Sequence, residues 1–287
     1  MLEKKGILYI VATPIGHLAD ISLHALEILK TVDLIAAEDT RTSKVLLSNY
    51  SIKTQMTAYH EHNEVAKSKT MLELLHKGKS IALISDAGTP LISDPGYSLV
   101  EKAHDEEIRV VPVPGACALI AALSASGIAT AKFSFEGFIA RASSARKALF
   151  NTYIKQQTTL IFYESSHRIV NCMEDISSVF ESDRKMAIAR ELTKTYETIV
   201  SGTVETVTNI VESNKNMQRG EFVVLVEGYR KKKNKEESVP EEVMETLSTL
   251  MSECSLKTAV SLAVKLTGLS KRKLYQAALE LEQSSKH

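Results

Sequence analysis

The stretch SDAGTPLISDPG, residues 85–96, follows a predicted buried strand over residues 80–84. Three small residues come directly after Asp86: Ala87, Gly88 and Thr89. Backbone amides of such small residues can approach a ligand closely. Asp94-Pro95-Gly96 predicts a helix start, with the aspartate as cap and the proline in the first turn. Ligands bind at the carboxyl ends of strands in open α/β sheets, so the stretch predicts a binding loop, although a plain turn explains the same residues.

The alternation of strand and helix continues on both sides of this loop, through the first 130 residues. Asp20 precedes an apolar pattern with helical spacing, which predicts a capped helix there. A further helix is predicted over residues 63–77, and a helix of small residues ends near 126–127. Buried strands are predicted over residues 6–12, 32–37, 80–84 and 108–113. This order is typical of an α/β domain with a largely parallel sheet.

The pattern restarts after residue 130 and predicts a second α/β domain, with residues 131–229 following a first domain of residues 1–130. Strands are predicted over residues 133–138, 158–163, 185–191, 197–201 and 222–226. Helices are predicted over residues 144–156 and 167–180, and from Val204 onward. Residues 230–242 are charged and contain a proline, which indicates a linker. Residues 243–287 are predicted to be a small helical domain, with a helix-turn-helix whose turn lies at 267–270.

The composition excludes several classes of protein. Lysine plus arginine and aspartate plus glutamate both number 35, so a basic field over the whole chain, common in nucleic-acid binders, is missing. The three cysteines form no C-x-x-C pair, which argues against a zinc or disulfide scaffold. The longest apolar run, residues 116–123, is far too short for a membrane span. We therefore expect a soluble cytoplasmic protein that makes no contact with a membrane.

Two other strand ends resemble the loop at residues 85–96. Thr13-Pro14-Ile15-Gly16 follows the first predicted strand, and residues 114–118 follow the fourth. Three loops of small residues at one sheet edge predict a composite cleft. Neither G-x-G-x-x-G nor G-x-x-x-x-G-K-[ST] is present, which argues against a nicotinamide cofactor and against nucleotide hydrolysis.

Eight stretches in this order resemble one family. They are GILYIVATPIGHLADIS (6–22), AAEDTR (36–41), YHEHN (59–63), SDAGTPLISDPG (85–96), VPVPGACALIAALSASGI (111–128), YESSHR (163–168), RELTK (190–194) and RGEFVVLVEG (219–228). The chain resembles the tetrapyrrole methylase fold family, in particular its branch that methylates a cytidine ribose in 16S ribosomal RNA of the small ribosomal subunit. The terminal helix pair fits that branch as well.

The resemblance implies two α/β domains of the tetrapyrrole methylase type, with S-adenosyl-L-methionine in the cleft between them, and a homodimer. In the first domain it assigns cofactor contacts to Pro14, Ile15, Asp86, Ala87, Gly88, Thr89, Cys117, Ala118 and Leu119. In the second domain it assigns them to Tyr163, Arg190, Gly220 and Glu221. The family usually has G-F-L-P followed by lysine where this chain has Gly137-Phe138-Ile139-Ala140-Arg141-Ala142, and proline at Ser166. These departures are expected to alter local loops and RNA contacts while leaving the cofactor loops intact.

A ribose hydroxyl needs a proton acceptor to become a good nucleophile, and three polar clusters offer candidate catalytic groups. His60 and Glu61 are candidate bases, although capping of the next helix explains their stretch too. His60 and His62 lack an evident third ligand, so no metal is expected. The stretch Glu38-Asp39-Thr40-Arg41 forms either a ribose or phosphate clamp, with Arg41 on the phosphate, or a capped helix start. Lys194 is a candidate phosphate contact, and the choice of base stays open.

Local positive charge offers a grip for RNA. Five of the six residues 230–235 are basic, and residues 254–287 carry six lysines or arginines against two glutamates. Phosphate contacts are therefore predicted at Lys231, Lys232, Lys233, Lys271, Arg272 and Lys273. A solvated linker followed by a satellite helix pair is the alternative interpretation.

Two other functions fit parts of the sequence. The tetrapyrrole methylase fold also serves methyltransferases that act on precorrin-type tetrapyrroles, because fold does not determine function. A DNA-binding regulator could use the helix-turn-helix together with a degenerate ligand-sensing domain. The YHEHN and YESSHR stretches and the helical tail favour RNA over a tetrapyrrole, and the intact cofactor loops argue against the regulator.

Overall fold

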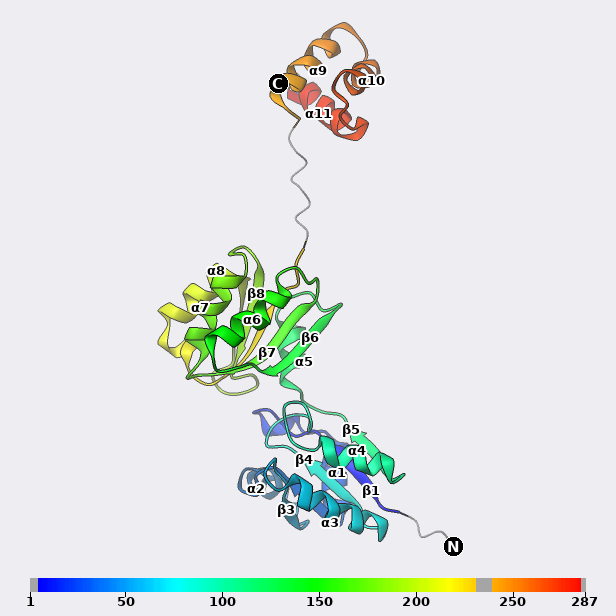
Figure 1. Ribbon diagram of the computed structural model, residues 1–287, viewed down its shortest axis with the longest axis vertical. Coiled ribbons are helices and arrows are strands. Elements are labelled where there is room, and N and C mark those ends of the chain that lie inside the picture. The colour runs from blue at the N-terminus through cyan, green and yellow to red at the C-terminus, as the bar shows by residue number, and fades with distance from the viewer. Residues whose placement is uncertain (1–4, 231–238, 285–287) are drawn as a thin grey trace. The chain divides into compact units, whose positions relative to one another are not determined.

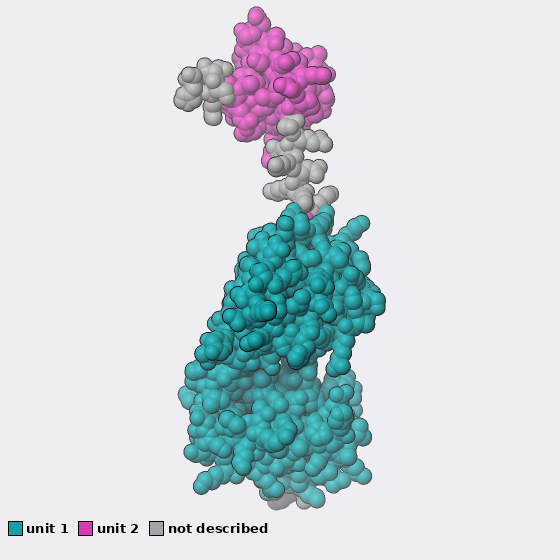
Figure 2. Space-filling model, turned by 90° about the vertical axis from the view of Figure 1, so that its left-hand side faces the viewer, with its two compact units in different colours: residues 1–229 teal, residues 230–287 magenta. Residues whose placement is uncertain are grey.

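The computed structural model describes residues 5–230 and 239–284, with side chains up to residue 282. The chain divides into two compact units, residues 1–229 and residues 230–287 (Figure 2). The first unit contains two five-stranded sheets, and the regular elements in the described part of the second unit are helices (Figure 1). Lys231, Lys232 and Lys233, predicted to contact RNA, lie outside the described residues. No helix among the described residues is both long and apolar enough to cross a bilayer.

The first sheet is entirely parallel, as the alternating pattern predicts. Its strands are β1 (Ile7–Val11), β2 (Leu34–Ala37), β3 (Met56–Ala58), β4 (Ile81–Ile84) and β5 (Arg109–Val113). They lie in the order β3-β2-β4-β1-β5, so β1 and β4 pair at the centre, with Leu8 opposite Ile81. The four residues of β4 are all buried because helices cover both faces of the sheet. The carboxyl ends of these strands form the edge that carries the cleft.

Four helices cover the first sheet, two on each face. The helices α1 (Leu23–Thr31) and α2 (Thr40–Asn49) pack on one face, where Leu29 and Leu47 are buried. The helices α3 (Glu64–His76) and α4 (Tyr97–Asp105) pack on the other face. Alternate residues of each strand point to opposite faces, and for this reason both layers are apolar.

Two predicted helix caps are wrong. Ser22, and not Asp20, caps α1, because its hydroxyl accepts a hydrogen bond from the Ala25 amide at 3.1 Å, while Asp20 lies in a short 3-10 turn. Asp94 does not cap α4, which begins at Tyr97 after Gly96. Gly96 has a φ of 132°, a backbone angle that glycine tolerates and other residues rarely adopt, so the chain turns there instead. Asp94 is thereby left in the loop.

The second sheet is mixed. Its strands are β6 (Phe133–Phe138), β7 (Thr159–Ser165), β8 (Lys185–Arg190), β9 (Thr198–Thr203) and β10 (Glu221–Val226), in the order β6-β7-β10-β8-β9. Only β6 and β7 are parallel. The helices α6 (Ser143–Tyr153), α7 (Ile169–Val179) and α8 (Val204–Ser213) pack on one face, around Phe150 and Phe162. We call the bodies around the two sheets the first and second lobes.

Helix α5 (Ala118–Ala125) covers the opposite face of the second sheet. Its buried residues Leu119, Ala122 and Leu123 share a core with Ile161 and Leu225. The chain therefore joins the second lobe soon after β5 ends. The division of residues 1–229 at residue 130 stays a prediction, and this packing favours a boundary before α5.

The second compact unit is a bundle of three helices, α9 (Glu241–Glu253), α10 (Leu256–Thr267) and α11 (Lys271–Ser284). Ser255 caps α10, and Gly268, in a left-handed conformation, ends it. The turn between α10 and α11 lies where the helix-turn-helix pattern predicts it. Leu247 of α9 packs with Val260 of α10 and Leu274 of α11, which provides a small core of its own.

Candidate active site

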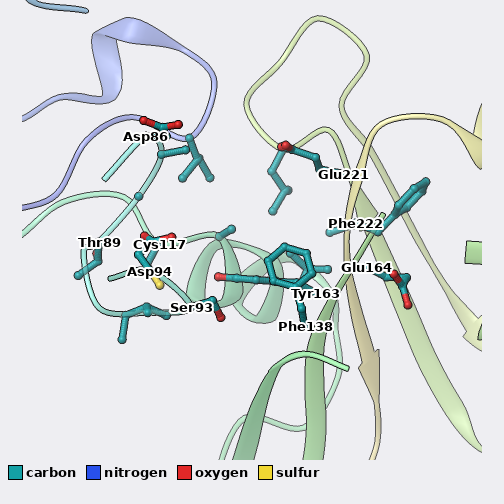
Figure 3. Close-up of a pocket in the computed structure, with 18 of the residues that line it drawn as sticks. Asp86, Thr89, Ser93, Asp94, Cys117, Phe138, Tyr163, Glu164, Glu221 and Phe222 are labelled. Carbon is teal, nitrogen blue, oxygen red and sulfur yellow. The ribbon is translucent and has the colours of Figure 1, made fainter. Parts of the chain in front are cut away.

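A cleft of about 240 Å³ lies between loops of the first lobe and strands of the second (Figure 3). Its lining residues are Ile15, Glu38, Asp86, Ala87, Gly88, Thr89, Ile92, Ser93, Asp94, Cys117, Ala118, Phe138, Tyr163, Glu164, Ala189, Leu192, Lys194, Glu221, Phe222 and Val223. All three loops predicted to converge at the sheet edge contribute to it. A space-filling view shows a hollow across the middle of the first unit (Figure 2).

Hydrogen bonds hold the three loops of the first lobe together. The backbone N–H groups of Thr13 and Gly88 each donate to the other's carbonyl, at 2.8 and 3.1 Å. The Thr89 hydroxyl donates to the Ala116 carbonyl at 2.9 Å. Leu91 and Ser93 adopt φ values of 72° and 70°, which are strained for residues with side chains. Strain of this kind is common in binding loops because the surrounding structure must impose it.

An aromatic wall closes the side of the cleft formed by the second lobe. The Tyr163 ring meets Phe135 and Phe138 edge to face, with centroids 4.8 and 5.5 Å apart. The Leu119 amide donates to the Tyr163 hydroxyl at 3.3 Å, which fixes the ring against α5. Burial raises the pKa of Tyr163 well above its ordinary value, so the phenol stays neutral. Of these rings, Tyr163 and Phe138 line the cleft and offer apolar contacts for a ring of a ligand.

Three carboxylates of the first lobe line the cleft, namely Glu38, Asp86 and Asp94. The Asp86 amide donates to Glu38 at 3.3 Å, and the Asp39 amide donates to Asp86 at 3.0 Å. In the described part of the chain, neither Glu38, Asp86 nor Asp94 forms an ion pair with lysine or arginine. Burial raises the pKa of all three, that of Asp94 to about 6. Partly desolvated carboxylates of this kind favour a positively charged ligand.

The carboxylates of the second lobe are paired. Arg168 binds the buried Glu164 at 2.9 Å. The Lys194 ammonium group lies 3.0 Å from Glu191 and 2.8 Å from Glu221. Burial lowers the pKa of Lys194, but the two carboxylates outweigh it and leave that pKa raised. Lys194 therefore stays charged at the cleft wall.

Some predicted cofactor contacts lie just behind the lining. Pro14 and Leu119 are buried, and Gly220 precedes the lining residue Glu221. The Arg190 side chain is buried, and it donates to the carbonyls of Arg219 and Tyr196 at 2.5 and 2.9 Å. In this geometry Arg190 braces the loops around it, and its guanidinium does not line the cleft.

Of the predicted catalytic residues, only Lys194 lines the cleft. Asp39 caps α2 and binds Arg41 at 2.6 Å, which holds the pKa of Asp39 at about 2. The Arg41 side chain is exposed. Glu61 is exposed, while His60 has one ring nitrogen 3.1 Å from Asn63 and the other buried without a hydrogen-bond partner. In residues 5–230 and 239–284, no three histidine, cysteine, aspartate or glutamate side chains could together hold a metal ion.

Several lining residues escaped the sequence analysis as ligand contacts. Glu38 was predicted only as part of the clamp at residues 38–41, although its position directly after the parallel strand β2 could have placed it in the cleft. Asp94 was assigned to a helix cap instead. The others are side chains of a mixed sheet whose register no local pattern shows: Phe138, Glu164, Ala189, Phe222 and Val223.

A sheet of five parallel strands joined to a second mixed sheet, with a cleft of loops between them, defines a known class of enzyme. The chain belongs to the Tetrapyrrole (Corrin/Porphyrin) Methylases family, whose model matches residues 7–208, and it is a methyltransferase. Residues 237–282 match the RsmI C-terminal HTH domain. Both matches confirm the resemblance seen in the sequence.

Two similar relatives of nearly the same length carry the same name. The chain is 49% identical to Ribosomal RNA small subunit methyltransferase I of Haemophilus influenzae, over 97% of this chain and 98% of the relative. It is 48% identical to the protein of that name from Escherichia coli O157:H7, over 97% and 96%. Among solved structures, the methyltransferase CobJ is similar in fold, with a TM-score of 0.58 and 18% identity, over 78% of this chain and 94% of that one.

Proposed function

We propose that the chain transfers a methyl group from S-adenosyl-L-methionine to the 2′-hydroxyl of a cytidine ribose in 16S ribosomal RNA of the small subunit. The observation that carries the proposal is the cleft: unpaired carboxylates of the first lobe face an aromatic wall of the second. The names of the relatives, which describe enzymes of small-subunit ribosomal RNA, support the substrate. We also infer that the protein is cytoplasmic and that it forms a homodimer. A measurement of its molar mass in solution tests the homodimer.

The residues of the cleft fit this cofactor. S-adenosylmethionine has two positive groups, an ammonium and a sulfonium, and one carboxylate. Glu38 and Asp86, which form no ion pair within the described part of the chain, suit the ammonium group or the ribose hydroxyls. Tyr163 and Phe138 suit the adenine ring. Ile15, Ala87, Gly88, Thr89, Cys117 and Ala118 leave room for the rest of the molecule because most of their side chains are small.

When bound, the cofactor supplies a methyl group on a cationic sulfur, which leaves as a neutral thioether. The cleft residues then have two tasks, which are to position the ribose oxygen in line with that methyl group and to remove its proton. Asp94 lines the cleft with a pKa of about 6, so its carboxylate is available near neutral pH. In our proposal Asp94 accepts the hydroxyl proton as the oxygen bonds to the methyl carbon. In the same proposal Lys194, which lines the cleft beside Glu191 and Glu221, contacts a phosphate of the substrate RNA.

Loss of the tail is expected to separate RNA binding from cofactor binding. Deletion of residues 230–287 removes the basic run at 230–235 and the bundle α9–α11, while every lining residue of the cleft is retained. RNA affinity and its dependence on salt should both fall, because fewer phosphates are neutralised. Affinity for S-adenosylmethionine, measured by calorimetry, should stay unchanged. If the truncated chain binds ribosomal RNA as the full chain does, the tail is not the RNA grip.

The proposed reaction can be tested directly. Small subunits from cells that lack the protein would be incubated with the enzyme and methyl-labelled cofactor, and the 16S RNA would be mapped by mass spectrometry. We expect one nucleoside to gain a methyl group on its ribose. A parallel reaction with precorrin tests the tetrapyrrole alternative. If the label appears on the tetrapyrrole and not on RNA, a tetrapyrrole replaces RNA as the substrate.

A further inference from the structure

A groove between α10 and α11 is the most distinctive surface of the C-terminal bundle. Its floor is apolar, with Leu256, Val260 and Leu279, and its rim carries Lys257, Lys271 and Tyr275. Tyr275 is 45% exposed, and it lies outside the buried stripe of α11 formed by Leu274, Ala277 and Ala278. The groove thus combines an accessible aromatic ring, an apolar floor and two cations. Glu282 also reaches its lining, and it has an interaction of its own.

Charge within the bundle is segregated along the sequence, and the two glutamates of α11, Glu280 and Glu282, lie near its end. Residues 254–279, which include all of α10 and the first part of α11, contain five lysines or arginines and no aspartate or glutamate. By contrast, α9 contains four glutamates and no basic residue. Charged residues that served only solubility would not need to be separated into a basic and an acidic part of the bundle. A polyanion that approaches α10 and α11 would meet positive charge alone along residues 254–279.

The shape of RNA limits which polyanion suits the groove. The major groove of a double-stranded RNA helix is too narrow for side chains of an inserted helix to read. Unpaired nucleotides, however, expose bases that stack on aromatic side chains while their phosphates meet lysine or arginine. Tyr275 beside Lys257 and Lys271 supplies both kinds of contact within one groove.

We propose that this groove binds an unpaired nucleotide of the substrate RNA, with the base stacked on Tyr275 and a flanking phosphate between Lys257 and Lys271. The inference rests on the proposed function, which makes RNA the substrate. It goes further because it states that the C-terminal bundle recognises single-stranded RNA. The competing outcome is that the helix-turn-helix binds a double helix, as it does in DNA-binding proteins.

The test uses the full-length protein and two probes: a labelled, unstructured oligoribonucleotide and an RNA duplex of equal length. Tyr275→Leu should weaken binding of the single strand at least about fivefold, from a lost stacking energy of about 1 kcal/mol or more. Tyr275→Phe should bind as the wild type does, because the ring is retained. Lys257→Gln should weaken binding about fourfold near 0.15 M salt and reduce the salt slope by about 0.7.

Lys265→Gln is the matched control, because Lys265 is an exposed lysine of the same helix that does not line the groove. Its effect should be smaller than that of Lys257→Gln. Thermal melts of each variant check that the bundle folds. Wild-type affinity of a folded Tyr275→Leu variant for the single strand overturns the proposal, as does an equal loss on the duplex. Binding reports on the groove even if wild-type enzyme methylates no RNA, so failure of the proposed function is recognised separately.

Discussion

Replacement of Asp94 by asparagine is expected to lower kcat about 10²- to 10⁴-fold, the usual contribution of a positioned proton acceptor. Asparagine keeps the size of the side chain but cannot take the hydroxyl proton. Affinity for S-adenosylmethionine should change much less than kcat. The measurement is single-turnover methyl transfer to small subunits, alongside calorimetry of cofactor binding.

The pH dependence gives an independent test of the same carboxylate. Burial raises the pKa of Asp94 to about 6, so the group is protonated and inactive below that pH and ionised above it. The rate of the wild-type enzyme should therefore rise about tenfold per pH unit below 6 and level off above it. The asparagine variant should lose this rise. Asp105→Asn, an exposed carboxylate of α4, is the control, and a wild-type rate in the Asp94 variant would remove Asp94 as the base.

Substitution of Gly88 by valine is expected to reduce cofactor affinity beyond about 100-fold. Gly88 has a φ of 92°, and its backbone pairs with Thr13, so a β-branched residue there is strained by about 1–3 kcal/mol. A Cβ atom at this position would lie 3.4 Å from Ile15 Cγ2, and the valine methyl groups would extend further into the cleft lining. Strain and lost space act together on the same loop.

Gly127 is a suitable control because, like Gly88, it has a positive φ. Its φ is 70°, and a Cβ atom there would have no neighbour within 4 Å. Gly127→Val should lower thermal stability while cofactor affinity stays near the wild-type value. If the Gly88→Val variant and the wild-type protein bind the cofactor with equal affinity, measured by calorimetry, the assignment of the cleft to the cofactor is refuted.

Local sequence signals predicted four of the five strands of the first sheet, whereas the short, half-buried β3 was given no predicted range. Ile81 to Ile84 is apolar throughout, and this pattern needs no knowledge of distant residues. Asp94 was misread because Asp-Pro-Gly satisfies the local rules for a helix start, whereas the turn at Gly96 depends on the loop as a whole. Helix α5 has an apolar pattern that fits either sheet, so its packing partner could not be predicted.

The candidate site was predictable where it consists of loops and unpredictable where it consists of strands. Residues 86–89 come from one stretch of small residues, whereas Phe138 and Phe222 join them only through the register of a mixed sheet. The unusual loop around Ala140 illustrates the same limit. Arg168 donates to the Ile139 and Ala140 carbonyls at 2.5 and 3.2 Å, a brace that no pattern at residues 137–142 indicates.

The position of α5 has a consequence for any opening of the enzyme. Cys117 and Ala118 line the cleft at the start of α5, which packs against the second sheet. Asp86 and Gly88 line it from a loop that is hydrogen-bonded to the first lobe. A swing of one lobe about residues 114–116 would carry the first pair away from the second. Entry and exit of a bound molecule would then change the surface that contacts it.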